Sequence, residues 1–84
     1  MFLSDMKNLH ARRIKAALVE AGLTQGDAAA LINVSDATFS RVIAGLREVT
    51  VPEAQILAAE LEKRLGRDVP IEELFGNPEQ EGAA

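Results

Sequence analysis

Apolar residues recur at helical spacing along most of the chain. Ile14, Ala17, Leu18 and Ala21 follow the order i, i+3, i+4, i+7, and the same order returns between residues 54 and 65. This spacing places such residues on one side of a helix. No run alternates between apolar and polar residues for long enough to predict a strand. The pattern therefore predicts an all-α domain of short helices separated by turns.

Capping residues set the bounds of five predicted helices. Ser, Thr, Asp or Asn suits the position before a helix, and Gly or Asn suits the left-handed position that ends one. The predicted ranges are 5–21, 25–32, 36–44, 51–65 and 70–75, with caps at Ser4 or Asp5, Thr24, Ser35 and Thr50. Thr24 with Asp27, and Thr50 with Glu53, have the spacing of a capping box. Asn33 is expected in the left-handed turn between the second and third helices.

Length and composition fit one small globular domain. The chain has 84 residues, of which 48% are hydrophobic and 26% charged, as in ordinary folded proteins. We assign residues 1–4 to an N-terminal arm, 5–75 to the folded domain and 76–84 to a flexible acidic tail. No apolar run reaches the roughly 18 residues of a membrane span. We therefore expect a cytoplasmic protein that does not associate with a membrane.

The sequence offers little for catalysis or metal binding. The absence of Cys excludes disulfides and thiolate metal sites. Ser35 and Ser40 have no His within reach, because the one His, His10, belongs to the first predicted helix. There is no Gly-rich phosphate loop and no cluster of metal ligands. We expect no enzyme activity, no cofactor, no metal and no small-molecule substrate.

Charge is unevenly distributed about a net value of −4. Residues 1–50 hold six cations and five anions, a net charge of +1, whereas residues 51–84 hold three cations and eight anions, a net charge of −5. Proteins that bind nucleic acid are usually basic, so the total disfavours such a partner. Charges are screened over about 8–10 Å, however, and a remote acidic surface does not exclude an anionic partner.

The residues from 23 to 45 occur in a distinctive order. This order is Leu23-Thr24-Gln25, Ala29, Val34-Ser35, Thr38, Ser40-Arg41 and Gly45. It resembles the pattern of the Cro/C1-type (XRE-type) helix-turn-helix family of phage repressors and bacterial transcriptional regulators. The resemblance covers roughly residues 10–76 and implies a compact five-helix, lambda-repressor-like DNA-binding domain, with the second and third predicted helices as the helix-turn-helix.

The chain departs from this family pattern at four positions. Asn33 replaces the usual turn Gly, and Ala28 replaces a usual Leu. Many members pair an Arg with a Glu at the positions of Leu18 and Ile43, where an apolar contact is expected instead. Replacing a buried ion pair with apolar residues is often neutral or stabilising, so these departures leave the expected fold intact.

The resemblance implies that the third predicted helix lies in the major groove of double-stranded DNA. Carried over position by position, the base-reading residues are Asp36, Ala37, Ser40 and Arg41, and the phosphate contacts are Thr24, Gln25, Thr38 and Arg47. Arg can donate two hydrogen bonds to guanine, and a carboxylate can accept from cytosine N4. Structural roles are open for some of them, since Thr24 is also a cap and Asp36 a first-turn acid that favours the helix dipole.

Two functions follow as hypotheses. The first is a sequence-specific transcriptional regulator, a minimal phage-type repressor or Cro-like protein that reads a palindromic operator as a homodimer. Its dimer surface is expected around Val69, Ile71 and Phe75, or else at Phe2 and Leu3. The alternative is a protein-interaction module, antitoxin-like or an adaptor, that keeps the fold with weak or no DNA binding. The net charge of −4 and the single cation of the third helix favour this alternative.

Overall fold

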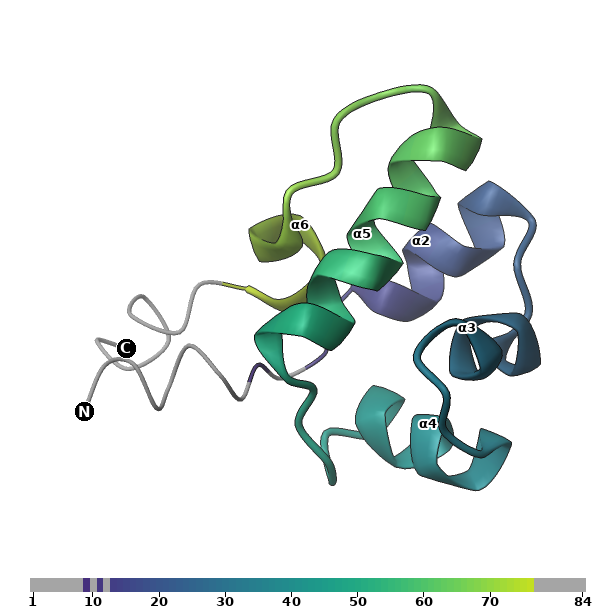
Figure 1. Cartoon of the computed structure of the whole chain (residues 1–84), viewed down its shortest axis with the longest axis vertical. Helices are drawn as coiled ribbons and strands as arrows, with labels where there is room; N and C mark the ends of the chain where they lie inside the picture. Colours follow the sequence, from purple (N-terminus) through teal and green to yellow (C-terminus); the bar gives the residue numbers. More distant parts are fainter. Residues whose placement is uncertain (1–8, 10, 12, 77–84) are drawn as a thin grey trace.

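Five helices account for most of the residues that the computed structural model describes, which are 9, 11 and 13–76. They are α2 (Ile14–Ala21), α3 (Gln25–Leu31), α4 (Asp36–Ile43), α5 (Val51–Leu65) and α6 (Ile71–Phe75) (Figure 1). Within these residues the only β structure is an isolated antiparallel bridge between Leu9 and Val49. The all-α prediction is therefore confirmed. No described helix is both long enough and apolar enough to cross a membrane.

The range predicted for the first helix is not helical throughout the residues that the structure describes. Leu9, Ala11 and Arg13 lie outside any helix, Leu9 belongs to the bridge, and α2 begins at Ile14. The Leu9 N–H donates to the Val49 carbonyl at 2.7 Å, and the Val49 N–H donates back at 2.9 Å. Leu9 is buried there, so a tertiary contact overrides the local helical preference. The proposed caps Ser4 and Asp5, the arm 1–4 and residues 77–84 of the tail lie outside the described residues.

Both ends of α3 have the predicted caps. The hydroxyl of Thr24 accepts from the Asp27 N–H at 3.0 Å, and the Asp27 carboxylate accepts from the Thr24 N–H at 3.0 Å. This capping box begins α3. Asn33 has a φ of +60°, and the next amide, that of Val34, donates back to the Ala29 carbonyl at 3.0 Å. These bonds end α3 and turn the chain directly into α4.

The remaining helix ends agree with the prediction to within one residue. Ser35 caps α4 by accepting from the Thr38 N–H, and Thr50 with Glu53 forms the capping box of α5. Three residues predicted to be helical occupy cap positions instead: Ile32, Ala44 and Pro70. These caps are hydrogen bonds between residues only three positions apart. The helix ends that they determine can therefore be predicted from the local sequence.

One apolar core lies between the helices. Its largest fully buried side chains are Phe39, Phe75, Ile14, Leu18, Leu57, Leu61, Leu74, Val42, Val49 and Val69. No polar or charged residue is buried in the part of the chain that the structure describes. Val69 and Phe75, predicted to form a dimer surface, are each only 1% exposed. That expectation is wrong for these two residues, because both side chains lie in the protein's own core; Ile71 is only partly buried.

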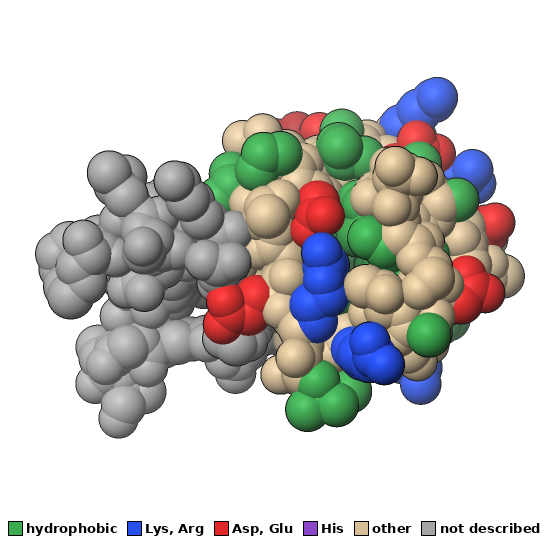
Figure 2. Space-filling view, turned by 60° about the horizontal axis from the view of Figure 1, so that its bottom comes forward, with side chains coloured by type: hydrophobic (Ala, Val, Ile, Leu, Met, Phe, Trp, Pro, Cys, Tyr) green, Lys and Arg blue, Asp and Glu red, His purple; other side chains and the backbone are tan. Residues whose placement is uncertain are grey.

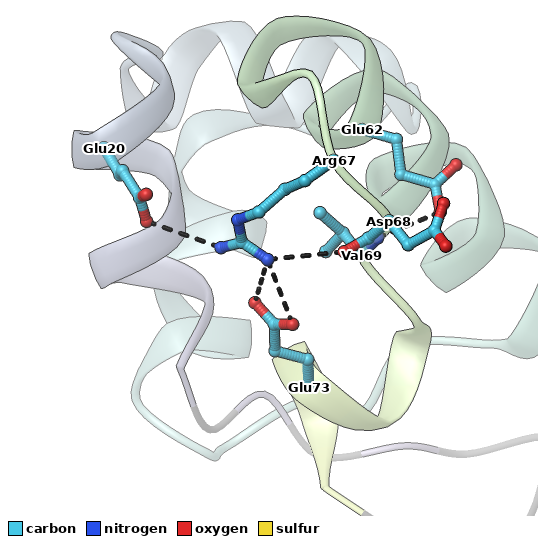
Figure 3. Close-up of polar contacts among 6 residues, drawn as sticks. All are labelled: Glu20, Glu62, Arg67, Asp68, Val69 and Glu73. Atoms are coloured by element: carbon cyan, nitrogen blue, oxygen red, sulfur yellow. Dashed lines mark hydrogen bonds and ion pairs between the residues drawn. The ribbon is translucent and has the colours of Figure 1, made fainter.

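Arg67, in the loop between α5 and α6, forms ion pairs with residues of α2 and α6 (Figure 3). Its Nη1 atom donates to both carboxylate oxygens of Glu73 on α6, at 3.2 and 3.1 Å, and to the carbonyl oxygen of Asp68. Its Nη2 atom lies 3.6 Å from a carboxylate oxygen of Glu20 on α2. The Val69 N–H donates to the Glu62 carboxylate at 3.0 Å. These contacts hold the loop so that Val69 enters the core.

The left-handed turn at Asn33 gives a first prediction. A residue with a Cβ atom pays about 1–2 kcal/mol in this conformation, and Asn avoids part of that through its short polar side chain. Asn33→Ala is therefore expected to lower the free energy of unfolding by about 1 kcal/mol, and Asn33→Gly to leave it equal or higher. Urea unfolding midpoints measure both. Equal midpoints for the Ala and Gly variants would contradict the assigned role of the turn.

Candidate nucleic-acid interface

The helix α4 has one buried stripe and one solvent-facing side. Phe39 and Val42 are both 0% exposed. The four predicted base-reading residues, Asp36, Ala37, Ser40 and Arg41, are all exposed. Their spacing of i, i+1, i+4 and i+5 sets them on the side of the helix away from the buried stripe. The structure thus brings all four together on one accessible surface, which we name the α4 face.

Small residues of α3 let α4 pack closely beneath this face. Ala28 and Ala29 are 0% and 1% exposed, and Ala occupies little space between two helices. Ala28, which stands where the family pattern usually has Leu, therefore fits this close packing of the two helices. Leu18 is buried and Ile43 is partly buried against the same core, so both positions that often carry an ion pair in the family are apolar core positions here.

Gln25 joins the start of α3 to the α4 face. Its Nε2 atom donates to the Ser40 hydroxyl at 3.5 Å, a long and therefore weak hydrogen bond. The contact nevertheless places Gln25, which is predicted to contact a DNA phosphate, beside Ser40, which is predicted to contact a base. A single DNA strand lying along this edge would meet both side chains.

Asp36 lies against the first turn of α3. A Cβ atom built on Gly26 would be 3.6 Å from each oxygen of the Asp36 carboxylate. This carboxylate is also the acid in the first turn of α4, where it favours the helix dipole. A phosphate bound at Gln25 would therefore have a carboxylate for a neighbour. Nothing in the sequence indicated this proximity.

The hydroxyls of Thr24 and Thr38 are used as acceptors inside the domain. Thr24 accepts from the Asp27 amide at 3.0 Å, and Thr38 accepts from the Ser35 hydroxyl at 2.9 Å. A hydroxyl has one donor and two acceptor positions, so Thr38 can still donate its hydrogen to a phosphate. The hydroxyl of Thr24 also bonds to the Asp27 carboxylate, so a phosphate would compete with that carboxylate for its hydrogen.

Arg47 stands at the C-terminal end of α4. Its backbone N–H donates to the Arg41 carbonyl at 3.2 Å. Its Nη2 atom lies 3.6 Å from the Glu53 carboxylate, and its Nη1 atom is buried with no hydrogen-bond partner among the described residues. Arg47, which is predicted to contact a DNA phosphate, is thus paired with Glu53 of α5. Sequence reasoning assigned Glu53 only to a capping box, and no sequence signal indicated the ion pair.

Figure 2 turns the α4 end of the molecule toward the viewer. Lys and Arg side chains lie near the middle of this surface, with Asp or Glu side chains close to one of them, and the described residues on this face form no continuous basic patch. Arg13 and Lys15 are exposed at the start of α2, whereas Arg12 lies outside the described residues. The described residues also bring together no group of three His, Cys, Asp or Glu that could hold a metal ion.

Comparison with known proteins assigns the family. Residues 14–67, well over half of the chain, match the model of a helix-turn-helix family. The chain therefore belongs to the Cro/C1-type helix-turn-helix family. All eight predicted DNA contacts fall within the matched residues. Neither the curated proteins nor the solved structures compared with the chain gave a match. Membership indicates a DNA-binding transcription regulator, and the family is typically non-enzymatic.

The capping box of α3 gives a prediction about acid stability. The Thr24 backbone N–H, and then the Thr24 hydroxyl, hold the pKa of Asp27 below its ordinary value of 3.8. A group with a lowered folded-state pKa stabilises the fold above its unfolded pKa and loses that effect as the pH falls through the folded pKa. Asp27→Asn is therefore expected to destabilise the protein more at pH 7 than at about pH 2.5.

Urea unfolding of the wild type and of Asp27→Asn at both pH values measures this difference. Asp68→Asn, which removes the same charge from an exposed residue, is the matched control. A difference between wild type and Asp27→Asn that stays constant with pH would show that the ionised carboxylate does not stabilise the cap.

Proposed function

We propose that this protein is a sequence-specific, double-stranded DNA-binding regulator that reads its site with the α4 face. The observation that carries the proposal is the division of α4 into a fully buried stripe and an exposed side that holds every predicted base-reading residue. A helix about 10–12 Å across fits the major groove, which is about 12 Å wide. An edge presented by a rigidly packed helix is suited to reading base pairs.

The side chains of the α4 face offer distinct base contacts. Arg41 can donate two hydrogen bonds to guanine O6 and N7, and Ser40 can bond several bases or a phosphate. Ala37 can touch a thymine methyl group, and Asp36 can accept from cytosine N4. Each of these residues is exposed, so no part of the core has to move before contact.

The surrounding residues are suited to the DNA backbone. Gln25 stands at the first position of α3, where free backbone amides favour a phosphate. The hydroxyl of Thr38 retains a donor for a phosphate, and that of Thr24 can turn to one from the Asp27 carboxylate. Arg47 follows the end of α4. Backbone contacts fix the register of the helix on the duplex, whereas base contacts supply specificity.

A domain of this size reaches only a few base pairs, so we propose a homodimer on a palindromic operator. A minimal phage-type repressor or Cro-like regulator, acting in the cytoplasm where its DNA lies, fits this arrangement. Val69 and Phe75 are in the core, and the other expected surface, Phe2 and Leu3, lies outside the described residues.

A protein-interaction module without strong DNA binding is the second candidate. The Asp36 carboxylate next to Gly26, the pairing of Arg47 with Glu53 and the net charge of −4 favour it. Retention on DNA that weakens with salt separates the two, because neutralising phosphates releases counterions. Retention independent of salt, or no retention, supports the interaction module.

Arg41→Ala tests the reading face directly. Loss of a bidentate contact to guanine is expected to weaken binding by about 1–3 kcal/mol and to relax the preference at one base pair. Binding sites selected from random duplexes supply the DNA, and titrations at fixed salt supply the affinities. Arg64→Ala, which removes the same charge from α5, is the control. Unchanged affinity and unchanged site preference in Arg41→Ala would refute the assigned docking.

The dimer proposal makes a separate prediction. Two half-sites are expected about 34–36 Å apart, one helical turn of DNA, so that both α4 faces meet the same side of the duplex. Footprinting of the selected site gives the spacing, and sedimentation gives the number of protein copies bound. A single protected half-site with one copy of the protein would overturn the dimer.

A further inference from the structure

Glu53 pairs with Arg47, a predicted contact of the DNA backbone. Its Oε2 atom lies 3.6 Å from Arg47 Nη2, whereas its Oε1 atom accepts from the Thr50 N–H at 3.1 Å. One carboxylate therefore both caps α5 and neutralises the cation that follows α4. The two functions rest on different oxygens, so a single substitution can separate them.

Arg47 is incompletely satisfied in this pairing. Its distance to Glu53 exceeds that of a good charge-assisted hydrogen bond, about 2.7–2.9 Å, and its Nη1 atom has no hydrogen-bond partner among the described residues. A guanidinium has five N–H donors and matches the geometry of a phosphate. The side chains of Arg47 and Glu53 are 34% and 20% exposed, and such partly exposed pairs are weak. A phosphate is therefore a better partner for Arg47 than Glu53 is.

The position of Arg47 makes this exchange relevant to DNA. Its backbone N–H and that of Leu46 both donate to the carbonyl of Arg41, so the Arg47 backbone is bonded to the end of α4 that carries a predicted base-reading residue. The next turn of chain leads into the cap of α5 at Thr50. A duplex against the α4 face would thus come near Arg47.

We propose that Glu53 withholds Arg47 from the DNA backbone and so sets the non-specific affinity of the protein at a low value. This inference rests on the proposed DNA-binding function. In the free protein the Glu53 carboxylate neutralises Arg47, and contact with a phosphate requires Arg47 to leave that carboxylate. Glu53 does not itself touch DNA; it is a positioning residue that acts through Arg47.

The test uses Glu53→Gln, because Gln keeps an oxygen for the Thr50 N–H but loses the charge that holds Arg47. Glu72→Gln, an exposed position on α6, makes the same change in net charge and is the matched control. The probe is a mixed-sequence duplex of about 30 base pairs titrated between about 50 and 200 mM salt. Thermal unfolding of each variant verifies that the fold is retained.

We expect Glu53→Gln to bind this duplex about three- to fivefold more tightly than Glu72→Gln. Its log–log salt slope is expected to steepen by up to about 0.9, the contribution of one phosphate. Arg47→Ala is expected to weaken binding more in the Glu53→Gln background than in the wild type, because only there is Arg47 freely available. This coupling is the readout that a purely structural role of Glu53 would not produce.

Two other outcomes have separate meanings. Binding by the wild type, with Glu53→Gln no tighter than Glu72→Gln or with an Arg47→Ala effect equal in both backgrounds, overturns this inference and leaves the proposed function standing. Absence of salt-dependent duplex binding in the wild type and in every variant overturns the proposed function itself.

Discussion

Burial of Phe39 and Val42 fixes how α4 sits on the rest of the domain. Burying one large apolar side chain is worth about 1.5–3 kcal/mol, a large share of the 5–15 kcal/mol that typically holds a domain together. Because both side chains are fully buried, α4 cannot rotate about its axis without exposing them. The opposite side of the helix is thereby held toward solvent, and the small side chains of Ala28 and Ala29 leave room for this close packing.

Much of the fold could be predicted from the sequence because its signals are local. The capping boxes at Thr24 and Thr50 connect residues three apart, and a left-handed Asn33 needs no distant partner. The start of α2 could not be predicted in this way. It depends on Leu9 pairing with Val49, forty residues further along, and no local pattern encodes such a contact.

In the candidate site too, local features could be predicted and contacts between distant residues could not. Exposure of the α4 face follows from helical periodicity once the buried stripe is identified. The ion pair of Arg47 with Glu53, and the approach of Asp36 to Gly26, depend on how loops and helix ends pack. The proposed dimer surface failed for a related reason. Val69 was expected on that surface, but the loop that carries it folds back onto the core, with the Val69 amide bonded to Glu62.

The residues matched by the family model and the residues of the core do not coincide. The match spans 14–67, whereas Leu9, Val69, Leu74 and Phe75 are buried core residues outside it. The Arg13 N–H donates to the Leu74 carbonyl at 2.8 Å. This hydrogen bond joins the segment before the matched residues to the segment after them. The apolar core therefore includes residues on both sides of the matched range. Grafting residues 14–67 alone onto another protein would transfer the reading helix but leave behind part of the scaffold that keeps it rigid.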